Sequence, residues 1–371
     1  MHLALIRHRL TSLGGAETTL LALTRELVRQ GHTVTVLTAD EQRPRALPAL
    51  ERVQWCHVPT WPGKVGRILG FAVHARRLVQ RAQFDLVYSL ERTLAQDAYR
   101  AGDGCHREWL ARRREYDSLV QRGQLAISPF HHLLLYLESR LYRSPDLRLI
   151  IANSRQVKEE VQRHYQVPAE KVRVIYNGVD HGRFRWQPQK HRPACPLILF
   201  VGSGFKRKGL RFLIAALAEL CHRPAQLLVV GQDRPQAYRS LATKLGVADK
   251  IIFLGPQHRV EEWYQRVALL VLPTIYDPCA NVVLEALACG RPVVTTAANG
   301  AAEFITPGLN GAVLPRPDDI PGLAAAMEEF LERANDPAVQ QAAVAAVAAL
   351  SWERTASETL AALTTMGQRR P

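Results

Sequence analysis

Two acidic residues stand at a spacing that could hold hydroxyl groups of a ligand. Asp277 and Glu285 are separated by seven residues, and residues 279–287 have the pattern of a helix. Asp277 then lies in the loop before this helix, and Glu285 lies about two turns along it. The two acids could hold hydroxyls at either end of a nucleotide sugar. The alternative is that Asp277 is only an acid favoured by the helix dipole and Glu285 a buried structural residue.

The first turn of the same predicted helix offers backbone N–H groups to a ligand. Such groups have no acceptor inside the helix, and together with the helix dipole they bind phosphate readily. They belong to Ala280, Asn281 and Val282. The segment therefore places an anion-binding element beside the two acids.

Residues 202–209 (GSGFKRKG) form a second candidate site for a diphosphate. Gly204 lets the backbone approach a ligand closely, and the side chains of Arg207 and Lys208 can neutralise phosphate charge. The segment is neither a Walker A motif nor a complete G-x-G-x-x-G motif, because Arg207 falls where the third glycine would stand. An ordinary basic surface loop is the alternative interpretation.

Hydrophobic periodicity predicts the elements that position these residues. Residues 3–6 and 33–38 have the pattern of buried strands, and residues 17–29 form an amphipathic helix between them, after a loop that contains Gly14 and Gly15. A strand, loop, helix and strand in succession predict a parallel sheet with a right-handed crossover.

The same pattern begins again after a polar, proline-rich segment at residues 188–196. We therefore expect an α/β protein of two Rossmann-like doubly wound domains, residues 1–185 and residues 186–351, which face a cleft. Residues 352–371 are expected to cross back to the first domain as a helix. In this architecture ligands bind where the carboxyl ends of the strands converge.

Charge is the informative bulk property. The 371 residues include 48 Lys and Arg against 34 Asp and Glu, which gives a formal net charge of +14. Such a surplus attracts nucleic acids, anionic lipid headgroups or phosphorylated substrates. No RRM, KH, zinc-finger or helix-turn-helix signature is present, so we do not expect a nucleic acid as partner. A solvated basic surface without a specific partner is the alternative.

Cysteine usage and hydropathy predict a cytoplasmic location. The six cysteines are scattered without a CxxC pair, so we expect neither a zinc site nor a disulfide framework. No run approaches ~18 consecutive apolar residues, and the apolar run after Met1 is too short for a signal-peptide core.

Residues 105–143 are basic and carry interleaved aromatic and aliphatic side chains, among them Trp109 and Leu110 beside the run Arg112-Arg113-Arg114. Such a segment can lie in a lipid headgroup layer. We expect it to dock the protein peripherally on the anionic inner face of the cytoplasmic membrane. The alternative is a helical hairpin whose apolar side packs on the domain.

Four motifs in order resemble the retaining GT-B glycosyltransferases of family 4. They are IYNGVD, FKRKG, the Asp277/Glu285 spacing and the run LEALACGRPVV. The resemblance covers nearly the whole chain. Within the family, stretches such as AGDGCHREW are similar to the glucosyltransferases of the bacterial lipopolysaccharide core, which use UDP-glucose and an inner-core heptose.

The resemblance implies roles for the donor-site residues. Arg207 and Lys208 match the basic pair that holds the donor diphosphate, and they would stabilise the leaving UDP without a metal. Glu285 matches the acid that binds the ribose hydroxyls. Asp277 matches the acid that contacts the sugar hydroxyls, although a Glu is usual there. Ala280 stands where glycine is common in the family.

Three further residues take roles from the resemblance. Gly14 and Gly15 match a loop near the donor phosphates, and Asp103 matches an acid suspected of catalysis or acceptor binding. Asp103 has an alternative interpretation as a turn acid between two glycines. Retaining transfer is often drawn with the leaving phosphate taking the acceptor proton, so Asp103 need not be essential.

The predicted function is retaining transfer of a hexose, with glucose favoured, from a UDP-sugar to a lipopolysaccharide core or related glycan. Neither a metal nor a cofactor is expected, and the partners are the UDP-sugar, the glycan or glycolipid acceptor and the membrane surface. One alternative is a sugar-nucleotide epimerase on a related scaffold, which needs acids for proton transfer at C2. Another is a basic membrane- or nucleic-acid-binding module without catalysis.

Overall fold

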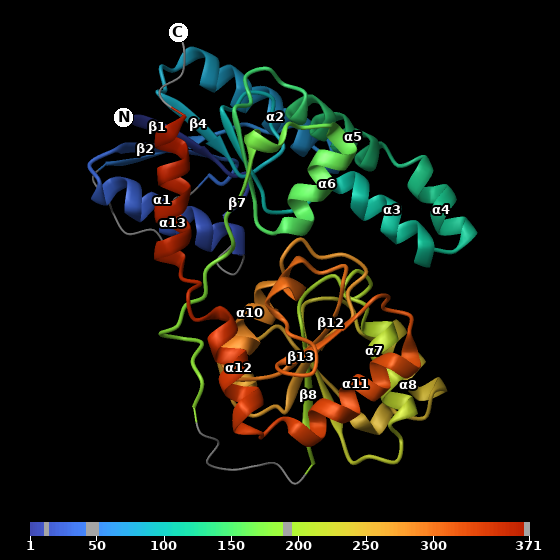
Figure 1. Ribbon diagram of the computed structural model, residues 1–371. Helices are drawn as coiled ribbons and strands as arrows, with labels where there is room; N and C mark the ends of the chain where they lie inside the picture. The colour runs from blue at the N-terminus through green and yellow to red at the C-terminus, as the bar shows by residue number, and fades with distance from the viewer. Residues whose placement is uncertain (11–14, 42–51, 188–194, 367–371) are drawn as a thin grey trace. The chain divides into compact units, whose positions relative to one another are not determined.

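The computed structural model describes residues 1–10, 15–41, 52–187 and 195–366, and it divides the chain into two compact units. Unit 1 comprises Met1–Gly178 and Trp352–Pro371, and unit 2 comprises Val179–Ser351. Each unit has one parallel sheet with helices packed on it (Figure 1). The predicted fold class, α/β with two Rossmann-like doubly wound domains, is confirmed.

The sheet of unit 1 has the strand order β3-β2-β1-β4-β5-β6-β7, and all neighbours are parallel. Its described strands are β1 (His2–Ile6), β2 (Thr33–Thr38), β3 (Val53–His57), β4 (Leu86–Ser89), β5 (Ala98–Ala101), β6 (Leu149–Ala152) and β7 (Val172–Val174). Its described helices are α1 (Gly15–Arg29), α2 (Lys64–Arg81), α3 (His106–Tyr116), α4 (Leu119–Ala126), α5 (Pro129–Tyr142), α6 (Arg155–Tyr165) and α13 (Trp352–Thr365). Strand β1 lies between β2 and β4, so its carboxyl end is the switch point of this sheet.

The alternation of side chains along β1 explains how both faces of this sheet are covered. Leu3 and Leu5 belong to the core cluster that includes residues of α1 and α13, whereas Ala4 and Ile6 belong to the cluster that includes residues of α2. Successive side chains of a strand point to opposite faces. Burial on both faces is typical of a central parallel strand and accounts for its continuous apolar run.

The last helix belongs to unit 1. In α13, Leu360 and Leu363 lie in the same buried cluster as Leu20 of α1. The Thr355 hydroxyl also donates a hydrogen bond to the Tyr176 carbonyl at 2.9 Å. The predicted return of the C-terminal helix to the first domain is therefore confirmed, and an apolar face of α13 explains it.

The boundary between the units differs from the prediction. The prediction divided the chain after residue 185, whereas unit 2 begins at Val179. Val179 forms a β-bridge with Ser351, and Arg183 forms an ion pair with Glu261 at 2.6 Å. These partners are distant in the sequence, so no local pattern indicates them, and they hold the segment after Gly178 to unit 2.

The sheet of unit 2 has the order β10-β9-β8-β11-β12-β13, again with parallel neighbours. Its described strands are β8 (Leu197–Val201), β9 (Gln226–Val230), β10 (Ile251–Gly255), β11 (Leu269–Leu272), β12 (Val293–Thr296) and β13 (Gly311–Leu314). Its described helices are α7 (Leu210–Glu219), α8 (Gln236–Lys244), α9 (Glu261–Tyr264), α10 (Asn281–Ala288), α11 (Ile320–Arg333) and α12 (Pro337–Val347), and η3 (Gly300–Phe304) is a 3-10 turn. Strand β8 lies between β9 and β11, which makes its carboxyl end the switch point.

Parts of two predictions fall on residues that the structure does not describe. Most of the predicted linker, residues 188–194, is among them, and so is Gly14. Gly15 is described as the first residue of α1. Within the described ranges, no helix combines the length and the apolar character needed to cross a bilayer.

Candidate functional site

Two loops leave the sheet of unit 2 at its switch point and are bonded to each other. One follows β8 over residues 202–209, and the other follows β11 over residues 273–280. The Ile275 amide donates to the Arg207 carbonyl at 2.8 Å, and the Thr274 hydroxyl donates to the same oxygen at 3.0 Å. The adjacency of β8 and β11 thus brings together two motifs that are about seventy residues apart in the sequence.

Glycines in the first loop allow these close approaches. Gly209 has a φ of 78°, and a Cβ on it would collide with the Pro273 carbonyl. Gly202 has a φ of 135°, and a Cβ there would collide with the aliphatic part of Lys208. Glycine is therefore required both for joining the loops and for seating the Lys208 side chain.

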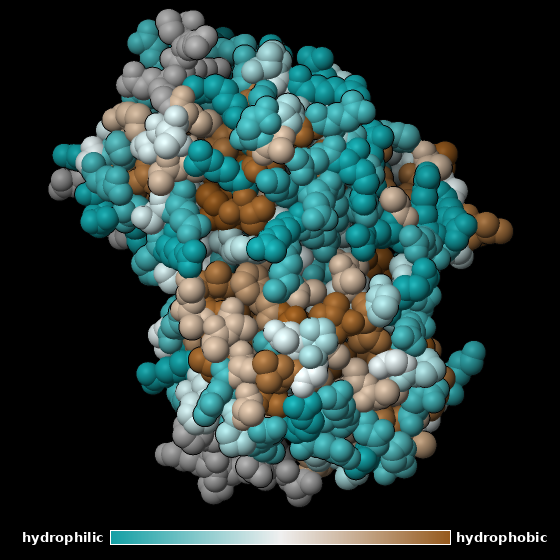
Figure 2. Space-filling model, in the orientation of Figure 1, coloured by the Kyte–Doolittle hydropathy of each residue, from teal (hydrophilic) through white to brown (hydrophobic). Residues whose placement is uncertain are grey.

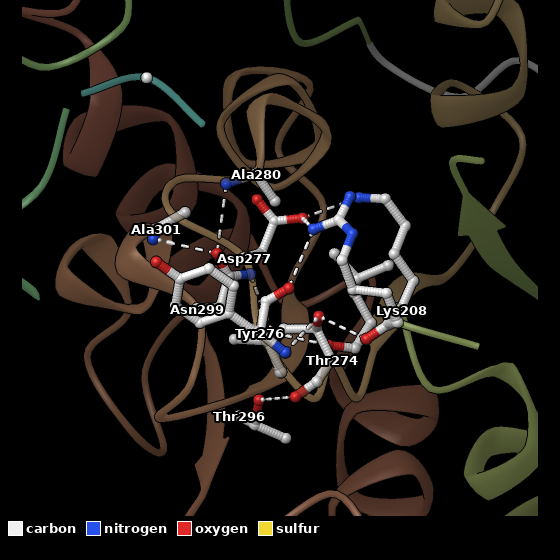
Figure 3. A network of polar contacts seen from close by, with 12 residues as sticks. Lys208, Thr274, Tyr276, Asp277, Ala280, Thr296, Asn299 and Ala301 are labelled. Carbon is white, nitrogen blue, oxygen red and sulfur yellow. Dashed lines mark hydrogen bonds and ion pairs between the residues drawn. The ribbon is translucent and has the colours of Figure 1, made fainter. Parts of the chain in front are cut away.

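The side chains of Lys208 and Asp277 meet where the loops join (Figure 3), and Arg207 binds the same carboxylate. Lys208 Nζ lies 3.1 Å and Arg207 Nη1 lies 2.9 Å from the same Asp277 oxygen, Oδ2. Arg207 Nη1 also donates to the Tyr276 carbonyl at 2.9 Å. Lys208 and Asp277 are only 7% and 6% exposed, whereas Arg207 is half-buried.

The electrostatics of this cluster follow from its burial and its charges. Burial lowers the pKa of Lys208, against the opposing effect of Asp277. Burial also disfavours the ionised form of Asp277, but the charges of Lys208 and Arg207 prevail and lower its pKa below the usual value. Two cations therefore face one carboxylate, and the net positive charge can attract an anion.

Glu285 lies on α10 in a different environment. Its Oε2 accepts a hydrogen bond from the hydroxyl of the fully buried Tyr264 at 3.1 Å. Burial raises the pKa of Glu285 to about 7, although the bond from Tyr264 acts in the opposite direction. At neutral pH this carboxyl can thus hold a proton, or release it to accept hydrogen bonds from ligand hydroxyls.

The amino end of α10 differs from the prediction in one respect. The Ala280 amide donates to Asn299 Oδ1 at 3.2 Å, so the expectation that this amide is unpaired is wrong. Asn281 and Val282 are the first residues of α10. The helix begins two residues later than the pattern suggested, because Ala280 has extended backbone geometry and is bonded to a distant side chain.

Sequence reasoning missed two residues that support this site. Asn299 is 1% exposed and binds the start of α10. Asp233, in the loop after β9, accepts a hydrogen bond from the Phe205 amide and so fixes the loop after β8. Asn299 precedes a glycine, a pattern that indicates only a turn, and Asp233 carries no local signal for its partner.

Two of the predicted residues, Gly15 and Asp103, belong to unit 1. Asp103 is exposed in the turn after β5. Nearby, Arg7 forms ion pairs with Glu17 at 3.1 Å and with Glu91 at 3.0 Å. Burial opposes ionisation of Arg7, yet the charges of Glu91, Asp103 and Glu17 raise its pKa above the usual range. A charged cluster therefore lies at the switch point of this sheet, which the sequence did not indicate.

The basic segment of unit 1 folds as α3, α4 and α5, with charged groups both buried and exposed. The fully buried Glu138 accepts from the amides of His106 and Arg107 and pairs with Arg92 at 3.2 Å. Arg113 pairs with Asp117 at 2.8 Å. Leu141 and Tyr142 of α5 lie in a buried cluster of unit 1, so the apolar side of α5 packs on the domain as the alternative expected, but the segment forms three helices and not a hairpin.

The other side of this segment exposes apolar residues. Leu119, Val120 and Ile127, on α4 and just after it, are 81%, 72% and 78% exposed. Figure 2 shows apolar side chains at the right-hand edge, where Figure 1 places α4. Arg114 and Arg122 are exposed in the same segment, so apolar and cationic groups occur together on this surface.

The cluster in unit 2 combines features suited to a phosphorylated, polyhydroxylated ligand. Arg207 and Lys208 supply positive charge, and Asp277 and Glu285 supply carboxylate acceptors. Within the described part of the chain, no group of three or more His, Cys, Asp or Glu side chains could hold a metal ion. The positive charges that the structure shows beside Asp277 are those of Arg207 and Lys208.

Both halves of the chain match families of glycosyltransferases. Residues 13–183 match the family described as Glycosyltransferase Family 4, and residues 195–333 match the family described as Glycosyl transferases group 1. The second range contains all the predicted donor-site residues of unit 2. The first range contains Gly14, Gly15 and Asp103.

Individual relatives agree with these families. The chain is 25% identical over 326 residues to the lipopolysaccharide glucosyltransferase WaaG of Escherichia coli (strain K12), and the match covers 82% of each chain. It is 31% identical over 243 residues to the D-inositol 3-phosphate glycosyltransferase of Kribbella flavida, covering 58% of this chain and 56% of that one.

Solved structures share the fold over nearly the whole chain. The crystal structure of WaaG superposes with a TM-score of 0.81 at 23% identity and covers 98% of this chain and 99% of that one. Anabaena Alr3699/HepE in complex with UDP-glucose superposes with a TM-score of 0.69 at 20% identity and covers 98% and 100%. These likenesses bear out the GT-B fold expected from the sequence.

Proposed function

The chain belongs to the family 4 glycosyltransferases, and on this premise we propose that it transfers glucose from UDP-glucose to a lipopolysaccharide core or related glycan acceptor. The transfer retains the configuration at the anomeric carbon and uses no metal ion. Unit 2 binds the donor and unit 1 binds the acceptor. The observation that carries the proposal is the Arg207/Lys208/Asp277 cluster at the switch point of unit 2.

The cation pair acts on the leaving group in this proposal. Cleavage of the bond between sugar and diphosphate places growing negative charge on the UDP oxygens. Lys208 is buried and held by Asp277, so its ammonium is already oriented before the reaction. Preorganised charge in a site of low dielectric stabilises the transition state more than mobile charge in water does. Lys208 and Arg207 thereby replace a divalent cation.

The carboxylates orient the donor. Glu285 binds the ribose hydroxyls, supported by its position on α10 and by its partner Tyr264. Asp277 contacts the hydroxyls of the sugar, and it has one oxygen beyond the Oδ2 that both cations bind. The amides of Asn281 and Val282 at the start of α10 face the diphosphate. Gly204 lets the backbone approach the donor.

The acceptor proposal rests on the relatives. The name of the Escherichia coli protein supports a lipopolysaccharide acceptor, and the Kribbella flavida protein makes inositol 3-phosphate the second candidate. Asp103, beside the Arg7 ion pairs, accepts hydrogen bonds from an acceptor hydroxyl. The leaving diphosphate takes the acceptor proton, so Asp103 assists binding and is not required as a base.

We also place the protein at the inner face of the cytoplasmic membrane. The exposed Leu119, Val120 and Ile127 would enter the headgroup region, and nearby arginines would pair with anionic lipids. A net charge of +14 favours the same surface. This location brings the enzyme to a lipid-linked acceptor.

The test is direct transfer of label. Purified protein is incubated with radiolabelled UDP-glucose, UDP-galactose, UDP-GlcNAc or GDP-mannose, and with a heptose-containing core acceptor or inositol 3-phosphate. We expect glucose on the core acceptor, an α-linkage by NMR and equal rates with and without EDTA. Label on inositol 3-phosphate alone would replace the acceptor assignment. A free epimer without transfer would support the epimerase instead.

A further inference from the structure

A buried asparagine joins the start of α10 to the start of η3. Asn299 follows β12 and is 1% exposed. Its Oδ1 accepts from the amides of Ala280 at 3.2 Å and Ala301 at 3.1 Å (Figure 3). Its Nδ2 donates to the Thr295 hydroxyl at 3.1 Å. One side chain therefore satisfies two backbone amides that belong to different elements.

The backbone around Asn299 reaches the carboxylate of the candidate site. Asp277 and Asn299 form a parallel β-bridge. The Asp277 amide donates to the Ala298 carbonyl at 2.9 Å, and the Gly300 amide donates to the Asp277 carbonyl at 2.9 Å. These bonds fix the main chain of Asp277, whose side chain binds both Arg207 and Lys208. Backbone contacts therefore connect Asn299 directly to Asp277, whose side chain belongs to the charged cluster.

We propose that Asn299 is a positioning residue for the donor site. It holds the amino end of α10 and the main chain of Asp277 in one arrangement, so that the carboxylate, the two cations and the helix terminus face the donor together. The inference rests on the proposed binding of a nucleoside diphosphate in unit 2. In this proposal Asn299 acts through Ala280 and Asp277 and does not itself contact the donor.

The position of Asn299 also determines which backbone amide at the start of α10 is bonded within the protein. The Ala280 N–H is used by Asn299 Oδ1, so this amide is not offered to the donor phosphates. A neutral amide at this place accepts the Ala280 N–H without adding negative charge. A carboxylate would accept the same bond and repel a diphosphate. Replacing Asn299 by Asp compares the neutral amide with the carboxylate at this position.

Asn310 provides a matched control. It is also 1% exposed, and its side chain bonds two backbone groups, accepting from the Thr306 amide at 2.7 Å and donating to the Phe304 carbonyl at 3.1 Å. None of these bonds involves residues 273–288. Asn310→Ala therefore removes a buried amide of the same kind from the same unit without loosening the start of α10.

The experiment measures UDP affinity by calorimetry and thermal midpoints for the wild-type full chain and each variant. Asn299→Ala should weaken UDP binding about tenfold or more, as expected when the three side-chain hydrogen bonds of Asn299 are lost. Asn310→Ala should lower the thermal midpoint comparably and leave the UDP dissociation constant within about twofold. Equal UDP affinity in folded Asn299→Ala, or equal weakening in Asn310→Ala, would overturn the proposal.

Asn299→Asp serves if the alanine variant does not fold. It keeps an acceptor for both amides, so we expect the variant to fold, although it loses the bond from Nδ2 to the Thr295 hydroxyl and buries a charge, and its thermal midpoint should fall. We also expect weaker UDP binding, because the new charge lies at the helix terminus. Unchanged UDP affinity would count against the inference. Absence of UDP binding in the wild-type protein would instead contradict the proposed function.

Discussion

Lys208 is the residue on whose charge the proposed donor site most depends. It is buried, its amine is held by Asp277, and its aliphatic part packs against Gly202. We predict that Lys208→Met, which keeps much of the side-chain volume, weakens UDP binding by about 1–3 kcal/mol, as for a lost charged hydrogen bond. Calorimetric titration with UDP measures the change. Lys206→Met, on the same loop, is the control and should bind UDP nearly as the wild type does.

Glu285 gives the site a dependence on pH. Its pKa is raised to about 7 by burial, so between the ordinary carboxyl pKa and pH 7 the folded protein binds more protons than the unfolded chain. The free energy of unfolding therefore falls as the pH rises through this window. We predict a loss on the order of 1–3 kcal/mol between pH 5 and pH 8 relative to Glu285→Gln. Urea denaturation of both proteins at the two pH values measures it.

Ionisation of Glu285 lowers the free energy of unfolding but should raise the affinity for UDP. An ionised carboxylate accepts bonds from two ribose hydroxyls, so UDP binding should release a proton from Glu285 near neutral pH. The affinity of the wild type for UDP should therefore rise more steeply from pH 6 to pH 8 than that of Glu285→Gln, because the terminal phosphate of UDP ionises with both proteins and Glu285 only with the wild type. Parallel pH profiles for the two proteins would remove Glu285 from the site.

At the scale of residues, the sequence predicted which element carries each acid better than it predicted the contacts of that acid. The types and spacing of Asp277 and Glu285 indicated a loop acid and a helical acid, and both lie where the spacing suggested. The pairing of Asp277 with Lys208 was not predicted, because it depends on the adjacency of β8 and β11. The role of Asn299 was also invisible, since its partners are backbone amides that any residue could supply.

At the scale of elements, the site depends on the close approach of the loops after β8 and β11. Gly209→Ala would force a methyl group against the Pro273 carbonyl at a positive φ. We predict that it lowers the free energy of unfolding by more than about 2 kcal/mol and abolishes measurable UDP binding. Gly246→Ala is the control, because its φ is +69° and no atom would contact the added Cβ. That variant should show only the backbone penalty, about 1 kcal/mol, and normal UDP binding.

Elements with a strong local pattern were predicted closely. The strand predicted over residues 33–38 has those bounds, and the first helix ends at Arg29 as expected. The helix of the candidate site begins later than predicted, at Asn281, because a distant side chain takes the Ala280 amide. Local sequence thus indicates where a helix can form, and tertiary hydrogen bonds decide its first residue.

At the scale of the whole molecule, α13 makes unit 1 depend on the end of the chain. Leu363 is 1% exposed in the core cluster that it shares with α1. We predict that Leu363→Ala lowers the free energy of unfolding of unit 1 by about 2–5 kcal/mol. Calorimetric melting measures this, with the exposed Thr364→Ala as control. UDP affinity should be unchanged at temperatures where unit 1 stays folded, because every proposed contact with the UDP moiety in unit 2 is intact.

The membrane proposal also belongs to this scale, and the structure decides which variants can test it. Replacing Arg112 and Arg113 by Glu would break their pairs with Glu108 and Asp117, so loss of binding could reflect loss of folding. Leu119 and Ile127 are exposed instead. We predict that Leu119→Ser with Ile127→Ser reduces co-sedimentation with vesicles that contain anionic lipid. The thermal midpoint should not fall.

The contributions of charge and of apolar contact to vesicle binding can then be measured separately. Arg114→Glu, at an exposed position, should weaken binding more at low salt than at high salt, because screening shortens the range of the attraction. The double variant Leu119→Ser with Ile127→Ser should weaken vesicle binding at both low and high salt. Leu309→Ser, an exposed leucine of unit 2, should leave binding unchanged. If all variants bind anionic and neutral vesicles equally, the segment around α4 has no role at the membrane, and the alternative of a solvated basic surface without a specific partner is favoured.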